Sequence, residues 1–435
     1  MSRSQKRLLV VQAAALGHDL LAARSATAWQ GLTFKPLEPV FPALTCPAQA
    51  TFRTGLAPTG HGVVANGFFF RDLGRPLFWE QSAGLVTGAR IWDRFRAAGG
   101  KVAMLFWQQS LGEAVDAVIS PAPIHKHHGG MIEGCHSQPA DLYPRLRAAV
   151  GADFRLRQYW GPLASAKSSR WIAHATAALL GDADHAPDLC LTYLPALDYD
   201  LQRHGPDSAQ ARQALDELFA ELTELSAAST RYGYEMLVFG DYAIGKVAGG
   251  AVFPNRLLRA AGLLAARDVN GRLYLDPHQG RAFAVVDHEV AHVYLRAESD
   301  RARVAELLTA APGVGQVLGR EEQAALGVAH ARSGDLVLVA APGHWCAYPW
   351  WLTDGEAPDY AGHVDIHNKP GYDPCELFFG WPPMSVSRDT ARIRGSHGRT
   401  GPDRKAAWAA TCDLGREPRT LADLAEAVRT WLGEG

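Results

Sequence analysis

Short apolar runs alternate along most of the chain with amphipathic segments of helical period. The apolar runs are typical of buried strands, and the segments with apolar residues three or four positions apart are typical of helices. This alternation favours an α/β fold with a mostly parallel sheet flanked by helices. The predicted strands are Leu8–Ala13, Val102–Phe106, Leu189–Leu194 and Glu235–Phe239, and the predicted helices are Thr45–Thr54, Ile91–Ala98, Ser168–Leu180 and Ala209–Thr230.

Residues 270–345 follow a different pattern. A β-rich stretch comes first, then a helix and another strand, at Ala282–Leu295, Arg303–Ala311 and Asp335–Ala340. We expect a smaller α+β insertion here, which acts as a cap over the α/β core formed by residues 1–269 and 346–435. The stretches 120–138 and 354–403 are rich in polar residues, Gly and Pro and are predicted as loops. A helix over Thr420–Leu432 is predicted to close the chain.

Composition narrows the class of protein. The chain has 435 residues, of which 47% are hydrophobic and 20% charged, so it is long enough to bury a large core. The formal net charge is −2 without a basic block, which argues against a nucleic-acid scaffold and leaves small anionic substrates open. The six cysteines are scattered without a C-x-x-C pair, which favours reduced thiols in the cytoplasm.

The beginning of the chain resembles a signal peptide only superficially. Lys6 and Arg7 precede an apolar run, but Gln12, His18 and Asp19 interrupt it early, so a buried first strand explains it better. No apolar run reaches about 18 residues, and we therefore expect no membrane span. Oligomeric state is left open by the sequence.

Residues 41–67 contain the first candidate for chemistry. Thr45 stands where an extended segment gives way to a helix, and Pro47 suits a first helical turn. A hydroxyl at this position is surrounded by free backbone N–H groups and the positive end of the helix dipole, which can also hold phosphate oxygens. The alternative is that Thr45 only caps the helix.

The same segment resembles the nucleotide pyrophosphatase/phosphodiesterase branch of the alkaline phosphatase superfamily. The resemblance is carried by Thr45 and Pro47, by Thr54-Gly55, and by the run Gly60-His61-Gly62-Val63 with Asn66. It implies an alkaline-phosphatase-like core, with Thr45 as the nucleophile and Asn66 as a donor to a phosphate oxygen. It also implies a small phosphorylated substrate and a two-metal centre.

Later motifs match the metal ligands of this family only in part. Asp198, Asp241 and His397 fall where the family has ligands. Three further ligands are replaced, because Gln202 and Tyr242 stand in place of histidines and no Asp lies near position 14. Gln12 or Asp19 would have to compensate for that Asp. A second alignment register pairs Asp200 with His204, so His204 is an alternative to Gln202.

Other polar residues could replace the missing ligands. Asp365 and His367 would share a face on a strand, and Lys369 could supply positive charge beside a phosphate. The alternative for these three is a solvated loop. The cluster His125-Lys-His-His128 could reach a site from a lid, although such runs usually lie in solvent.

One motif points to a different chemistry. His288-Glu-Val-Ala-His292 matches the H-E-x-x-H pattern of zinc proteases, which requires a helix. The surrounding residues are β-branched and predict a strand, on which His288 and His292 share a face and Glu289 points away. Asp287 and His288 could then still serve as polar residues of another site.

These observations predict a metal-dependent phosphoric ester hydrolase of the phosphodiesterase or nucleotide pyrophosphatase type. Its cofactor would be one or two divalent metals, zinc or alternatively manganese. The loss of ligands motivates a second hypothesis, a degenerate member that binds a phosphorylated metabolite without turnover. A zinc metalloprotease is the third.

Overall fold

The computed structural model describes residues 6–128 and 130–433, and a mixed eight-stranded sheet forms its centre. The strand order is β11-β8-β7-β12-β1-β13-β24-β4. The middle strands run parallel and are β8 (Ala117–Pro121), β7 (Val102–Leu105), β12 (Leu189–Leu194), β1 (Leu8–Ala13) and β13 (Glu235–Gly240). The outer strands pair antiparallel and are β11 (Cys135–Gln138), β24 (Ala406–Ala410) and β4 (Lys35–Leu37). The predicted α/β class and mostly parallel sheet are confirmed.

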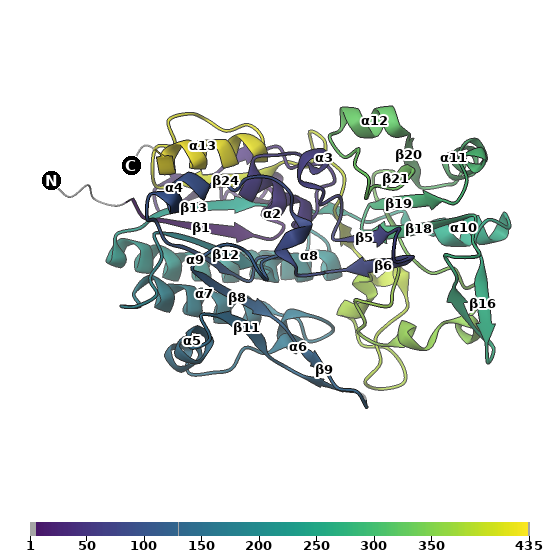
Figure 1. The fold of residues 1–435 in the computed structure, drawn as a ribbon, viewed down its shortest axis with the longest axis horizontal. Helices are drawn as coiled ribbons and strands as arrows, with labels where there is room; N and C mark the ends of the chain where they lie inside the picture. Colours follow the sequence, from purple (N-terminus) through teal and green to yellow (C-terminus); the bar gives the residue numbers. More distant parts are fainter. Residues whose placement is uncertain (1–5, 129, 434–435) are drawn as a thin grey trace.

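Helices cover both faces of this sheet (Figure 1). The long helices α7 (Ala166–Leu180) and α9 (Ala209–Tyr232) pack on one face. Helices α2 (Thr45–Thr54) and α13 (Leu421–Gly433) lie together on the other. Because both faces are covered, every residue of β1 and β12 is buried, which explains their uninterrupted apolar runs.

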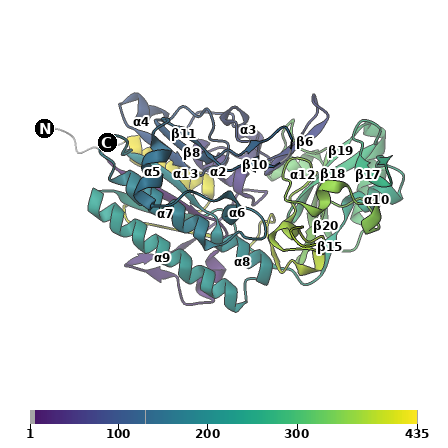
Figure 2. The same cartoon turned by 90° about the horizontal axis from the view of Figure 1, so that it is seen from below.

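A second, smaller lobe lies at one end of the large sheet (Figures 1 and 2). Its antiparallel sheet consists of β18 (Ala282–Asp287), β19 (Val290–Leu295), β21 (Leu336–Ala340) and β20 (Val314–Leu318). Helices α10 (Pro254–Ala260) and α11 (Arg301–Thr309) contact it. Its hydrophobic core also includes Leu258 and Ala361, so this lobe extends beyond residues 270–345 on both sides.

Two local predictions need correction. Residues 120–138 are not a loop, because they contain the end of β8, the hairpin β9 (Ile124–His125) with β10 (Met131–Ile132), and β11. The polar strand β11 forms because β8 offers an open edge for pairing, which no local pattern reveals. The helix expected over residues 91–98 is confined to α4 (Asp93–Ala97).

The described residues also bear on membrane association and cysteine pairing. None of their helices combines the length and apolar character that a membrane span needs. The six cysteines are all unpaired, as expected for reduced thiols.

Candidate active site

A small pocket opens where the carboxyl ends of β12 and β13 face the second lobe. Ligand sites of α/β proteins occur at this edge of the sheet, because loops and helix N-termini converge there. The large sheet and its helices contribute Thr45, Gln108, Tyr193, Asp198, Gln202 and Tyr242, and other segments contribute Asn66, Trp79, Trp160, His288, Tyr372 and Glu376.

Thr45 is the first residue of α2 and not its cap. The N-cap is Leu44, no side chain bonds the helix end from that position, and Thr45 is 3% exposed. The tyrosines Tyr193 and Tyr242 lie beside its hydroxyl. Both tyrosines line the same pocket as Thr45, and burial raises the pKa of both phenols. The Thr45 hydroxyl therefore faces the pocket instead of closing the helix.

Asn66 connects the start of α2 to the second lobe. Its Oδ1 accepts a hydrogen bond from the backbone N–H of Cys46 at 2.9 Å. Its Nδ2 donates to Asp287 Oδ1 at 3.2 Å, and its backbone N–H donates to Asp287 Oδ2 at 2.8 Å. Asn66 is thus held rigidly beside Thr45, and its donation to a phosphate oxygen stays a prediction.

Asp198 and Gln202 lie one turn apart on one face of α8 (Ala196–His204), as residues four positions apart must. Asp198 accepts hydrogen bonds from the Tyr242 hydroxyl at 3.0 Å and from the Gln202 amide. Burial raises the pKa of Asp198 to about 7, although both hydrogen bonds favour its charged form. Gln202 Oε1 is buried without a hydrogen-bond partner.

His397 follows β23 (Gly395–Ser396) and is 1% exposed. Its Nδ1 lies 2.8 Å from the carbonyl oxygen of Ala43, so Nδ1 carries the proton and Nε2 presents a lone pair. That Nε2 has no hydrogen-bond partner and lies 3.8 Å from Asp198 Oδ1. Burial lowers the pKa of His397 to about 3, which keeps the ring neutral, as a metal ligand requires.

Asp241 is bound to the end of strand β1. Its Oδ1 accepts a hydrogen bond from the backbone N–H of Ala15 at 3.0 Å, and its Oδ2 accepts one from Gln12 Nε2 at 2.9 Å. Burial raises the pKa of this carboxyl to about 7 as well. Gln12 therefore reaches Asp241, whereas Asp19 is largely exposed on α1 (His18–Ala22).

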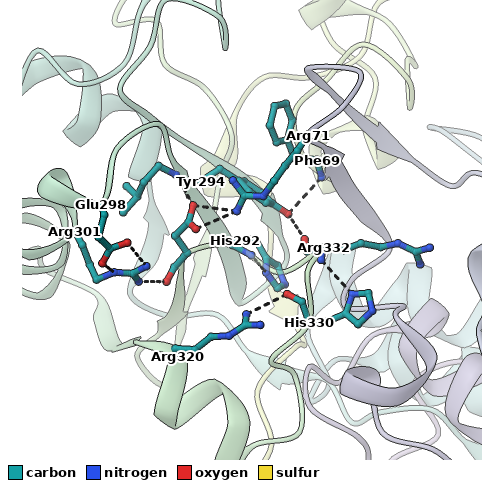
Figure 3. A network of polar contacts seen from close by, with 12 residues as sticks. Phe69, Arg71, His292, Tyr294, Glu298, Arg301, Arg320, His330 and Arg332 are labelled. Carbon is teal, nitrogen blue, oxygen red and sulfur yellow. Dashed lines mark hydrogen bonds and ion pairs between the residues drawn. The ribbon is translucent and has the colours of Figure 1, made fainter.

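The H-E-x-x-H segment forms a hairpin, so the expected strand with both histidines on one face is wrong. His288 stands in the turn between β18 and β19 with φ 57° and lines the pocket, and its ring centroid lies 3.7 Å from that of His397. His292 lies on β19, where it bonds the backbone of Val64 and Gly334, in the polar network between the lobes (Figure 3). Because the zinc-protease pattern requires a helix, this geometry contradicts the protease hypothesis.

Three predicted ligands are not brought to the pocket. His204 is six residues from Asp198, which places it on another face of α8, and its side chain is 38% exposed. Asp365 accepts hydrogen bonds from the backbone of His367 and Asn368 in a tight turn. The His367 ring contacts that of His125 on the exposed hairpin β9–β10.

The positive charge of Lys369 is already paired. Its Nζ lies 3.1 Å from Asp373 Oδ2 and 2.6 Å from Glu376 Oε1, and the side chain is 1% exposed. Asp373 and Glu376 line the pocket, but Lys369 does not. Lys369 therefore stabilises these carboxylates from behind the pocket wall.

Sequence reasoning missed most aromatic residues of the pocket. Tyr193 and Tyr199 flank the end of β12 and are close to Asp198 in the sequence, so the sequence could have predicted them as pocket residues. Trp79, Trp160 and Tyr372 come from distant segments, and their rings lie 4.9 to 6.4 Å apart. Only the tertiary fold brings these three together.

The donor atoms of the pocket fit one metal position better than two. Asp198 and Gln202 line the pocket and offer a carboxylate and an amide oxygen, and His397, which packs against the lining residues Tyr242 and His288, offers an imidazole nitrogen. The amide oxygen and the imidazole Nε2 are unpartnered. Asp241 accepts a hydrogen bond on each oxygen, as Asp198 does, and Gln12 Oε1 beside it is also unpartnered, but Tyr242 stands where the family has a histidine ligand. Elsewhere in the described part of the chain, Asp182, Asp184 and His185 lie close enough to share an ion, but Arg145 already pairs with this surface group.

The fold is an α/β core whose pocket lies at the carboxyl end of the sheet, facing a second lobe. A model of the Type I phosphodiesterase / nucleotide pyrophosphatase family matches residues 19–373, and the chain belongs to this family. Members of the family are generally dependent on divalent metals. Among curated protein sequences, none matches the chain.

Solved structures share the fold over nearly the whole chain. Phosphonoacetate hydrolase from Sinorhizobium meliloti 1021, in complex with phosphonoformate, superposes with a TM-score of 0.63 at 16% identity and covers 99% of this chain and 96% of its own. Murine ectonucleotide pyrophosphatase / phosphodiesterase 5 gives a TM-score of 0.60 at 16% identity, with 98% and 95% covered. An inactive form of the murine protein was solved with AMP, with a TM-score of 0.59, 15% identity, and 98% and 95% covered. At these identities the likeness establishes the fold.

Proposed function

We propose that this chain is a phosphoric ester hydrolase of the phosphodiesterase type with Thr45 as its nucleophile. The observation that carries the proposal is the Thr45 hydroxyl on the first residue of α2, which lines the pocket and caps nothing. The N-terminal end of a helix favours an anionic phosphoryl group beside that hydroxyl. Membership of a phosphodiesterase family supports the same reaction.

The reaction would proceed in two displacements. In the first, Thr45 Oγ1 forms a bond to phosphorus while the bond to the leaving oxygen breaks, and the hydroxyl proton leaves with the alcohol product. In the second, water attacks the phospho-threonine, releases the phosphate product and restores the hydroxyl. Asn66 would hold a phosphoryl oxygen, and Tyr193 and Tyr242 would orient the Thr45 hydroxyl.

Asp198, Gln202 and His397 would hold a divalent metal, zinc or manganese. When bound, such an ion supplies positive charge that stabilises the charge developing on the phosphoryl oxygens. His397 is prepared for this role, because its Nδ1 is fixed on the Ala43 carbonyl and its Nε2 faces Asp198. Asp241, which the sequence also predicts as a ligand, has a hydrogen-bond donor on each oxygen, as Asp198 does, but Tyr242 stands where the family has a histidine ligand beside it.

Small phosphate esters are the proposed substrates. Structurally similar proteins bind phosphonoformate or AMP, and an aromatic pocket suits a compact organic group next to a phosphate. A second candidate is a protein that binds such a ligand without cleaving it. The hydrogen bonds that already occupy both oxygens of Asp198 and of Asp241 favour this candidate.

Turnover of bis-p-nitrophenyl phosphate by the purified protein tests the proposal, with Thr45→Ala as the decisive variant. Thr45→Ala should abolish turnover, whereas Thr45→Ser should retain part of it because a hydroxyl remains. Thr223→Ala removes an exposed hydroxyl on α9 and serves as the matched control. Equal turnover by Thr45→Ala and the wild type would refute the role of Thr45 as the nucleophile. AMP binding without turnover by the wild type would favour the binding protein.

A further inference from the structure

The two metal positions implied by the family have diverged to different degrees in this chain. The first keeps Asp198 and His397 and has Gln202 in place of a histidine. At the second, around Asp241, Tyr242 stands in place of a histidine, and the segment near position 14, whose Ala15 N–H bonds Asp241, has Ala14 and no Asp. Neither a methyl group nor a neutral phenol is a suitable ligand for a divalent ion.

The Asp241 carboxylate is also a hydrogen-bond acceptor for strand β1 and the turn after it. Gln12 Nε2 and the Ala15 N–H each donate to one of its oxygens, at 2.9 and 3.0 Å. Gln12 and Asp241 are both fully buried, so water does not compete for these bonds. An ion at this position would have to displace two buried donors that do not line the pocket, which is costly, whereas Gln202 and Tyr242, the donors to Asp198, line the pocket.

Tyr242 packs against the residues of the first position and lines the pocket that also holds Thr45. Its hydroxyl donates to Asp198 Oδ1 at 3.0 Å. Its ring stacks on His397 with centroids 3.5 Å apart and planes 4° from parallel. The side chain is 2% exposed, so its orientation is set by packing on every side.

We propose that this chain has lost the second metal of a two-metal centre and that Tyr242 has taken over the positioning of Thr45. Gln12 and Ala15 hold Asp241 as a structural residue. The Tyr242 phenol connects Thr45 to Asp198 and thereby aligns the hydroxyl for attack. This proposal rests on the proposed function, because it assigns Tyr242 to the reaction of Thr45.

Metal stoichiometry is the first test. The wild-type chain is saturated with Zn²⁺ or Mn²⁺, freed of excess ion and measured by elemental analysis. We expect no more than one ion per chain, and a value near two would overturn the proposal. The double variant Ala14→Asp/Tyr242→His restores the family's ligands and should bind about one ion more than the Ala14→Asp control. If the folded double variant gains no ion, residues 14 and 242 do not close the second position.

Steady-state kinetics of Tyr242→Phe is the second test. Loss of the hydroxyl should lower kcat by about tenfold to a hundredfold and leave KM within about twofold, since Thr45 is misaligned while the pocket is retained. Metal stoichiometry should not change. Tyr234→Phe is the matched control, because it removes a buried phenol bonded to the Pro187 carbonyl, before the start of β13. An unchanged kcat in Tyr242→Phe would overturn the positioning role.

The outcomes separate this proposal from the proposed function. A wild type that binds two ions and hydrolyses the ester refutes the loss of the second metal and leaves the hydrolase standing. A wild type that binds at most one ion and shows no turnover confirms the closed second position and refutes both the hydrolase and the positioning role of Tyr242. Circular dichroism of each variant verifies that it is folded before its result is counted.

Discussion

Asp198 and Asp241 are two buried carboxylates that follow the strands β12 and β13 of the same sheet. Asp198 lines the pocket, whereas Asp241 does not. Burial raises the pKa of each to about 7. Asp198 accepts its hydrogen bonds from side chains that line the pocket, Gln202 and Tyr242. Asp241 accepts its own from Gln12 and the Ala15 backbone, which belong to the central strand β1 and the turn after it.

The difference shows that a matched motif position does not preserve its role when its neighbours change. Around Asp198, unpartnered donor atoms of His397 and Gln202 remain available to a ligand. Around Asp241, the hydrogen bonds join β13 to β1, and although Gln12 Oε1 is also unpartnered, neither Gln12 nor Asp241 lines the pocket. We therefore expect changes at Asp198 to act on ligand and metal, and changes at Asp241 to act on stability.

The largest effect should come from removing each carboxylate. Asp241→Ala leaves two buried donors without an acceptor and should lower the free energy of unfolding by about 2–4 kcal/mol. Asp198→Ala should lower turnover at least about a hundredfold and lower that free energy by no more than about 1 kcal/mol, because its donors can bond water in the pocket. Urea unfolding and ester hydrolysis measure the two quantities. Similar losses of stability in the two variants would contradict the division of roles.

The second effect concerns pH. A carboxyl whose pKa is raised to about 7 binds its proton more tightly in the folded than in the unfolded chain, so it lowers stability as pH rises from about 4 to about 7. Asp241→Asn lacks this titration. Its free energy of unfolding relative to wild type should therefore rise by on the order of 1 kcal/mol per pH unit in that window and level off above it.

Urea unfolding between pH 4 and 8 measures the pH effect. Asp216→Asn, at an exposed position of α9, is the control and should track the wild type. A pH-independent difference between Asp241→Asn and wild type would show that Asp241 does not change its proton affinity on folding.

The third effect compares the two glutamines. Gln12→Leu removes a donor to Asp241 and should lower the free energy of unfolding by about 1–2 kcal/mol without changing metal affinity. Gln202→Leu should weaken metal binding about tenfold or more and leave stability within about 1 kcal/mol. Calorimetric titration with Mn²⁺ and urea unfolding test both variants. Equal metal affinities in both variants would show that Gln202 is not a metal ligand.

The smallest effect is expected at His204. His204→Ala should leave turnover, metal content and stability unchanged within about 0.5 kcal/mol, because its side chain faces away from the pocket. The comparison with Gln202→Leu decides between the two alignment registers of this segment. A loss of metal in His204→Ala would restore His204 as a ligand.

Strongly patterned segments could be predicted from the sequence alone. The bounds of β1, β12 and α2 agree with the predicted residues, because a fully buried strand needs a continuous apolar run and α2 ends at a glycine with positive φ. β11 could not be predicted, since its polar residues form a strand only by pairing with β8. The division of the chain at residues 270 and 345 stays a prediction, and the hydrophobic core around β18, β19 and β21 also takes in α10 and the segment near Ala361.

For the site, the sequence by itself determined which chemical groups the chain has and which it lacks. Thr45, Asp198, Asp241 and His397 stand in motif order, and the losses near position 14 and at residues 202 and 242 could be read directly. These facts follow from residue identity and local spacing, which depend on no distant contact.

Only the tertiary structure decided what those groups do to one another. It paired Gln12 with Asp241, aimed Tyr242 at Asp198, brought the His288 hairpin against His397 and paired Lys369 with Asp373 and Glu376. Each of these contacts joins side chains whose directions depend on helix phase, hairpin turns and the packing of one lobe on the other. Such directions are set by the whole fold, and no local pattern of residues encodes them.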